Sequence, residues 1–126
     1  MKRNPAPAHT WINDAACIED DPSTYDIDTP FTQSLSDKHL NLTYIHDRLQ
    51  NLQCTTCSVA AQCAADAAFH RDTGVIRGGL PLFPTHGRGV HLRRIIAPVL
   101  VRVAIGAPVD KMQKLAIDRL TEAIRT

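Results

Sequence analysis

Three of the four cysteines in this chain lie within ten residues, in the spacing Cys54-x2-Cys57-x5-Cys63. The fourth, Cys17, lies well upstream. Thiolates are the ligands of structural zinc sites and of iron–sulfur clusters, and such sites join segments that are distant in sequence. The cysteine pattern therefore predicts a metal or cluster site that ties residue 17 to the segment 54–63, and this constrains any fold of the chain.

The chain is short and its apolar residues are mostly aliphatic. It has 126 residues, of which 44% are hydrophobic and 5% aromatic. This length favours one domain with a modest core, to which a bound cofactor could add stability. Because the core must come largely from Ala, Leu, Ile and Val, we expect an all-α fold, a small helical bundle.

Helical periodicity supports this expectation in several stretches. Leu42, Ile45, Leu49 and Leu52 form one apolar stripe within residues 40–52. The Ala-rich stretch 59–70 has high helix propensity, with Ser58 as its predicted N-cap and Cys57 in the turn before it. Further helices are predicted at 10–17, at 90–103 with a kink or break at Pro98, and at 109–124. Residues 18–36 are predicted to form an acidic loop and 72–81 a Gly-rich turn, with no convincing strand pairing.

Charge is distributed unevenly along the chain. Residues 1–70 hold nine acidic and four basic residues, whereas residues 71–126 hold four acidic and ten basic residues. A basic C-terminal half indicates either nucleic-acid contact or a solvated basic helix face. We find no secretory signal, and the longest apolar stretch, 95–109, is too short to cross a membrane. We therefore expect a cytoplasmic protein that does not bind membranes, whose reduced thiols are metal ligands rather than disulfides.

Spacing alone leaves the bound group open. Structural zinc sites typically use two Cys-x2-Cys pairs, whereas this chain has one pair and two separate cysteines, which favours a [4Fe–4S] cluster over zinc. Four ligands leave no iron open to substrate, so we expect no enzyme activity. The second alternative is a zinc-stabilised DNA- or protein-binding module. The third is a dithiol–disulfide oxidoreductase using Cys54 and Cys57, but such motifs normally follow a strand in an α/β fold.

The combined motifs resemble the WhiB-like (Wbl) proteins of actinobacteria and their phages. The resemblance covers roughly residues 10–94. It rests on the following elements in order: Trp11-x3-Ala15-Ala16-Cys17, Asp21-Pro22, Cys54-x2-Cys57-x5-Cys63, a Gly-rich turn and a basic tail.

The resemblance implies that Cys17, Cys54, Cys57 and Cys63 are the ligands of a [4Fe–4S] cluster. It implies a helical bundle organised around that cluster, which is sensitive to oxygen and nitric oxide. It also implies a transcription regulator that binds the C-terminal region of the primary sigma factor in RNA polymerase and contacts promoter DNA. The expected parts are a mobile N-terminus at 1–9, a cluster-binding domain at 10–84 and a basic helical extension at 85–126.

Two departures from the family pattern bear on these expectations. Arg77 stands where the family turn usually has Trp, and Ser58 stands where the family often has Pro. We expect the first change to alter sigma-factor binding and the second to be structurally mild. The residues expected to contact the sigma factor are Trp11, Arg77, Gly78 and Gly79. The residues expected to contact DNA are Arg88, Arg93 and Arg94.

Overall fold

The computed structural model describes residues 14–17, 20, 22–27, 42–84 and 89–125. Within these ranges it has four α-helices, two short 3-10 helices and one two-stranded hairpin. The bounds are η2 Pro22–Tyr25, α2 Leu42–Gln50, η3 Gln53–Thr56, α3 Ala60–His70, β1 Val75–Arg77, β2 Leu80–Leu82, α4 Gly89–Ala104 and α5 Val109–Arg125. The predicted helix at 10–17 and the predicted loop at 18–36 lie largely outside the described residues.

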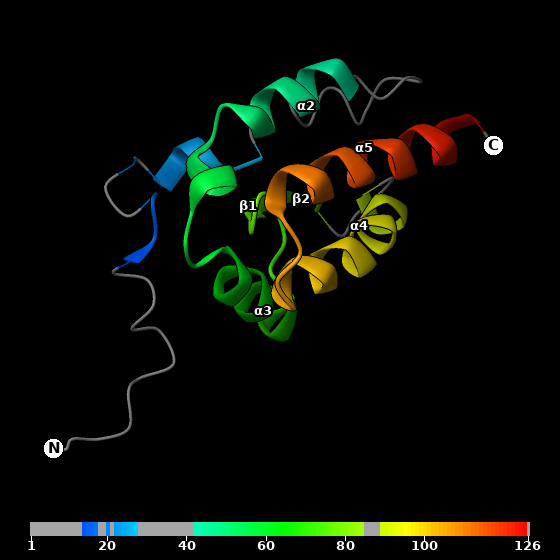
Figure 1. Cartoon of the computed structure of the whole chain (residues 1–126). Helices are drawn as coiled ribbons and strands as arrows, with labels where there is room; N and C mark the ends of the chain where they lie inside the picture. The colour runs from blue at the N-terminus through cyan, green and yellow to red at the C-terminus, as the bar shows by residue number, and fades with distance from the viewer. Residues whose placement is uncertain (1–13, 18–19, 21, 28–41, 85–88, 126) are drawn as a thin grey trace, which may run out of the picture.

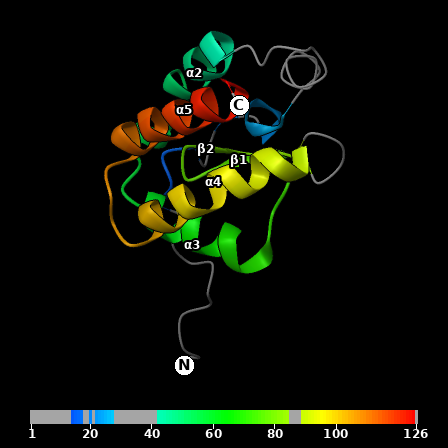
Figure 2. The same ribbon diagram turned by 90° about the vertical axis from the view of Figure 1, so that its right-hand side faces the viewer.

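The hairpin lies between two groups of helices. Figures 1 and 2 show α2 and α5 side by side on one side of it and α3 on the other, while α4 packs along both α3 and α5. The domain is therefore mostly helical, as predicted, but the all-α prediction missed a pair of strands. None of the helices in the described ranges is both long and apolar enough to cross a membrane.

The hairpin forms because two adjacent glycines adopt left-handed backbone conformations. Gly78 and Gly79 have φ of 61° and 84°, which a two-residue type I′ turn requires at both positions. The strands pair antiparallel, with Val75 opposite Leu82 and Arg77 opposite Leu80. The turn was predictable from its glycines but the strands were not, because runs of three residues are too short to give a periodic signal.

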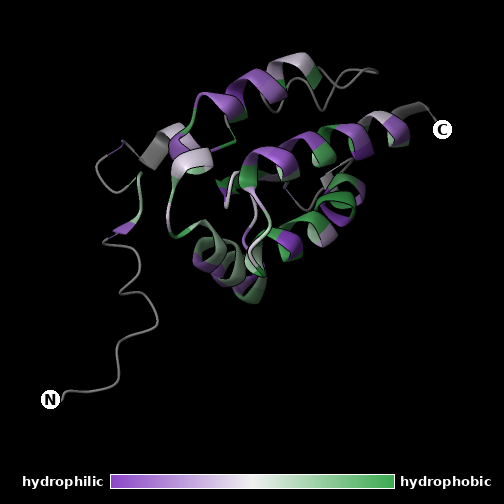
Figure 3. Cartoon of the chain, viewed as in Figure 1, coloured by the Kyte–Doolittle hydropathy of each residue, from purple (hydrophilic) through white to green (hydrophobic). Residues whose placement is uncertain are grey.

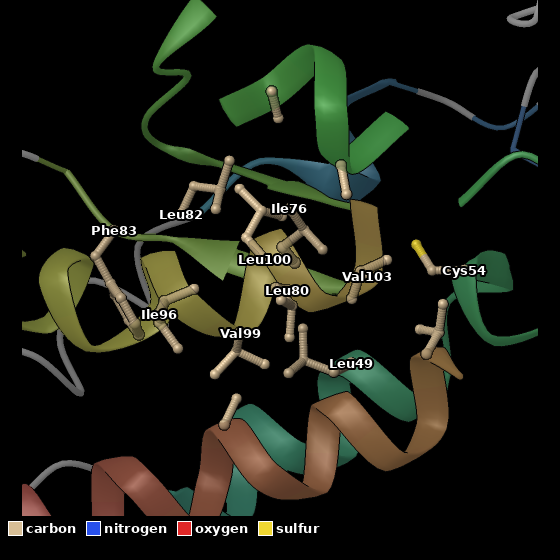
Figure 4. Close-up of a cluster of buried hydrophobic side chains, with 14 of the residues drawn as sticks. Leu49, Cys54, Ile76, Leu80, Leu82, Phe83, Ile96, Val99, Leu100 and Val103 are labelled. Carbon is tan, nitrogen blue, oxygen red and sulfur yellow. The ribbon is translucent and has the colours of Figure 1, made fainter. Parts of the chain in front are cut away.

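The core is built from apolar side chains of the helices and the hairpin. Its largest fully buried members are Ile45, Leu49, Ile76, Leu80, Leu82, Phe83, Leu92, Ile96, Leu100 and Leu120. Of the four cysteines, all of which the structure describes, Cys54 alone belongs to the buried cluster. It lies at the opposite end of the core from Phe83 (Figure 4).

The helix predictions are confirmed for α2, α3, α4 and α5, with two corrections. Ser58 does not cap α3, because the helix begins one residue later than predicted, and Val59 occupies the cap position without a side-chain hydrogen bond. Helix α4 continues through Pro98 without a break. Pro98 is exposed, so water can bond the carbonyl that lacks an N–H donor, and buried neighbours on the opposite face hold the helix together.

The amphipathic pattern of α5 explains its position. Green apolar and purple polar segments alternate along this helix in Figure 3. Val109, Gln113, Ala116 and Leu120 recur at helical spacing and are buried against the hairpin, α2 and α4. The C-terminal helices thus share one core with the cysteine-bearing segment.

Candidate functional site

The four cysteines, here called the four-thiol site, come from three separate segments. Cys17 lies in the N-terminal segment, Cys54 in η3, Cys57 directly after η3 and Cys63 on α3. None forms a disulfide. The backbone N–H of Ala16 donates to Cys57 Sγ at 3.4 Å across 41 positions of sequence, so the structure brings the distant segment to the Cys-rich one.

Two of the thiols, Cys54 and Cys17, have raised pKa values. Burial, the largest cause, and the charges of Cys63, Cys17 and Cys57 together raise the pKa of Cys54 to about 12, against an opposing backbone hydrogen bond from Gly79. Burial also raises the pKa of Cys17, and Cys57 and Cys63 add to this effect. A neighbouring negative charge disfavours ionisation, so a charged thiolate at one of these cysteines makes the others harder to ionise.

A polar network around Asp20 holds the Cys17 segment in place. The Asp20 backbone N–H donates to the carbonyl oxygen of Cys17 at 2.9 Å. Gln53, next to Cys54, donates to both carboxylate oxygens of Asp20, and the Tyr25 hydroxyl donates to one of them at 2.6 Å. Arg48 on α2 donates to the carbonyl oxygens of Thr24 and Asp26, which anchors the same segment to the helix.

Local structure determines the positions of the other three cysteines. The Cys57 N–H donates to the Cys54 carbonyl oxygen at 3.2 Å, closing the 3-10 turn between them. Cys57 lies in the turn before α3 and Cys63 in its first turns, and both placements confirm the sequence prediction.

Cys63 Sγ accepts two hydrogen bonds from the hairpin. The Gly78 backbone N–H donates to it at 3.3 Å and Arg77 Nε at 3.1 Å. The two remaining guanidinium nitrogens of Arg77 donate to Asp72 and Asp66. Arg77 therefore links a sulfur atom to two carboxylates.

The donor set fits a thiolate-bound group, although no metal geometry is assembled. Among the described residues, no group of three or more Cys, His, Asp or Glu is arranged to hold a metal ion. Four thiols with N–H donors on Sγ atoms are nevertheless the ligand chemistry of iron–sulfur sites, where such hydrogen bonds tune the cluster. Cluster binding by this chain is a proposal that the donor set supports.

Several predicted contact residues are placed in the interior. Gly78 and Gly79 are buried: a Cβ on Gly78 would lie 2.9 Å from Ala64 Cβ, and one on Gly79 would lie 2.4 Å from Val109 Cγ1. Helices α3 and α5 therefore cover this turn, while the Arg77 side chain keeps 26% exposure.

The predicted DNA contacts differ in exposure. Arg94 is exposed on α4. Arg93 is half-buried, its Nη2 donates to the Asp72 carbonyl oxygen at 3.0 Å, and its buried Nε has no partner among the described residues. Trp11 and Arg88 lie outside the described residues.

The residues that surround the thiols were not predicted from the sequence. Asp66 lies three residues after Cys63, a spacing that puts both side chains on one helix face and could have indicated their proximity. Gln113 stands in the apolar stripe of α5, where a polar residue signals a buried hydrogen bond. The partners of Asp20 and Asp72 gave no such signal, because they depend on the tertiary fold.

Fold and site together define a small, mostly helical domain with Cys54 at one end of its apolar core and the Cys17 segment hydrogen-bonded to Cys57. No protein-family model matches the chain, and neither does any curated protein or solved structure.

Proposed function

We propose that this protein is a transcription regulator of the WhiB-like type, which binds a [4Fe–4S] cluster through Cys17, Cys54, Cys57 and Cys63. The observation that carries the proposal is the gathering of these four thiols from three segments, with N–H donors on Cys57 and Cys63. The motif order in the sequence supports the same reading.

When bound, the cluster would supply a redox-active centre that reacts with oxygen and nitric oxide. The chain's own residues hold the surrounding surface in place. Asp20, Gln53 and Tyr25 fix the Cys17 segment against η3, and Gly78 and Arg77 fix the hairpin against Cys63. Loss of the bound group would remove one constraint on how these segments fit together.

The proposed partners are the C-terminal region of the primary sigma factor within RNA polymerase, and promoter DNA. Arg77 is the residue of this segment whose side chain a partner could contact. Gly78 and Gly79 would contribute by giving the turn its shape. Arg94, with Arg88 and Arg93, would supply phosphate contacts, which position a protein on DNA and weaken with salt.

The oxidoreductase alternative has less support. The attacking cysteine of a Cys-x2-Cys redox motif is accessible and has a lowered pKa, whereas Cys54 is buried and burial raises its pKa to about 12. The motif also follows helix α2 and not a strand. A zinc-stabilised DNA- or protein-binding module uses the same ligands and is separated by metal analysis.

The decisive experiment is anaerobic purification of the full chain with iron, acid-labile sulfide and zinc analysis and visible absorption. If the bound group is a [4Fe–4S] cluster, we expect four irons and four sulfides per chain. Each Cys→Ser variant should lose the visible absorption. A pull-down with the primary sigma factor, with and without the cluster, then tests the partner. A colourless protein with one zinc and no sulfide would exclude the cluster proposal.

A further inference from the structure

Arg77 makes an unusual set of contacts for a residue in a hairpin. It lies at the end of β1, and its three guanidinium nitrogens each reach a different group. Nε donates to Cys63 Sγ at 3.1 Å, Nη2 to Asp66 Oδ2 at 3.1 Å, and Nη1 to Asp72 Oδ2. The side chain is about three-quarters buried, so solvent screens these contacts only in part.

The two carboxylates hold the guanidinium in one orientation. Asp66 is on α3 and Asp72 follows its end, and each accepts from a different terminal nitrogen of the guanidinium. A guanidinium is planar and always charged, and its fork can satisfy several acceptors at once. Nε is thereby held toward Cys63 and is not left to sample other rotamers.

A fixed positive donor on a ligand sulfur changes the charge balance at that sulfur. Hydrogen bonds to the sulfurs and the net charge nearby set the reduction potential of iron–sulfur clusters. One-electron reduction adds negative charge that a cationic N–H donor stabilises. Removing Arg77 would also leave Asp66 and Asp72 without this cation beside Cys63, which disfavours the added electron further.

We infer that Arg77 is a positioning residue that raises the reduction potential of the group bound by the four-thiol site, through its hydrogen bond to Cys63 and its pairing with Asp66 and Asp72. The inference rests on the proposed function. It assigns Arg77 a role at the cysteines in addition to any contact with a partner.

The test is a potentiometric titration of the anaerobically purified full chain, with dithionite as the electron donor and visible absorption as the readout. Three variants are compared with the wild type: Arg77→Gln, Arg77→Lys and, as a matched loss of charge at an exposed position of α5, Arg119→Gln. Circular dichroism and iron content establish that each variant is folded and loaded.

We expect Arg77→Gln to lower the reduction equilibrium constant about tenfold or more, which is about 59 mV for a one-electron couple. Arg77→Lys should shift it less in the same direction, because an ammonium keeps the charge but cannot bond all three acceptors together. Arg119→Gln should match the wild type. If Arg77→Gln does not fold, the direction of the Arg77→Lys shift decides.

Unchanged potentials in loaded Arg77 variants would overturn this inference and leave the proposed function intact. An equal shift in Arg119→Gln would also overturn it, since the effect would then be one of overall charge. A wild-type protein without iron and sulfide would overturn both proposals.

Discussion

Gln113 Nε2 donates to the carbonyl oxygen of Gly79 at 3.1 Å, joining helix α5 to the turn of the hairpin across 34 positions of sequence. The same nitrogen lies 3.4 Å from the carbonyl oxygen of Leu49 at the end of α2. Gln113 is 1% exposed, so this amide connects three elements inside the core.

Gln113→Met should therefore destabilise the fold while nearly preserving side-chain volume. The substitution removes the amide donor to the Gly79 carbonyl oxygen and one of the two donors to the Leu49 carbonyl oxygen, which also accepts from the Leu52 N–H; this costs about 1–3 kcal/mol in the free energy of unfolding. Urea denaturation followed by circular dichroism measures the change. The neighbouring exposed Lys114→Met is the control, expected within about 0.5 kcal/mol of the wild type. Equal stability of the two variants would contradict the role given to Gln113.

Gly79→Ala should be more damaging than Gly74→Ala. Both glycines have positive φ, 84° and 76°, so alanine is strained at either position. A Cβ at Gly79 would also lie 2.4 Å from Val109 Cγ1, whereas one at Gly74 meets nothing within 4 Å. Overpacking of this kind costs about 1–3 kcal/mol beyond the shared strain. Thermal unfolding of the pair measures the difference, and similar melting temperatures would refute the close approach of α5.

Cys54 should be the slowest of the cysteines to react in metal-free protein. It is 9% exposed, and burial raises its pKa to about 12, so little of the reactive thiolate is present at pH 8. Cys57 and Cys63 are less buried. Iodoacetamide labelling followed by peptide mass spectrometry should give a rate for Cys54 about tenfold or more below theirs. In urea the four rates should converge; a persistent difference there would show that the fold is not its cause.

Tyr25→Phe should lower stability in a manner that depends on pH. Burial raises the pKa of Tyr25 above its ordinary 10.0, and the hydrogen bond to Asp20 raises it further. The folded protein therefore keeps the proton that the unfolded chain loses near pH 10, so this stabilisation is present below pH 10 and declines as pH rises above it. Urea denaturation should show a loss of about 1–2 kcal/mol at pH 7. The difference in unfolding free energy between wild type and variant should become smaller by pH 11. A difference that does not change with pH would contradict the stabilising role given to the protonated Tyr25 hydroxyl.

Arg94→Ala should weaken DNA binding without destabilising the fold. Arg94 is exposed on α4, and one lost phosphate contact reduces the slope of log affinity against log salt by about 1. Fluorescence anisotropy with labelled duplex DNA at several salt concentrations measures it. Arg93→Ala should instead lower the melting temperature, because Arg93 donates to the Asp72 carbonyl oxygen from a half-buried position. Binding by Arg94→Ala with the wild-type salt slope would exclude a phosphate contact at this residue.

The helices that could be predicted are those whose apolar pattern repeats over several turns. The stripe through Ile45 and Leu49 and the repeat through Ala116 and Leu120 extend over several turns, and both helices lie where the pattern indicates. The hairpin strands have three residues each, and they are stabilised by pairing and by burial under α4 and α5, which local sequence does not encode. The prediction that Ser58 caps α3 was wrong. A cap preference of about 1 kcal/mol is outweighed by packing, here the burial of Val59.

The candidate site divides in the same way. Residue type and spacing singled out the four cysteines, which the fold brings together. Spacing did not reveal that Arg77 reaches Cys63 and both carboxylates, because that contact exists only once β1 packs on α3. The burial of Gly78 and Gly79 was equally beyond local reasoning, since α3 covers Gly78 and α5, far along the chain, covers Gly79.

The position of the cysteines relative to the apolar core bears on whether the protein could survive loss of a bound cluster. Three of the four lie outside the buried cluster, which consists mostly of aliphatic side chains from the helices and the hairpin. If the proposed cluster is destroyed, the chain should retain its helices and a shaped set of thiols. Under the proposed function, the cluster would then be reassembled on the existing polypeptide, and one molecule would serve through many rounds of damage and recovery.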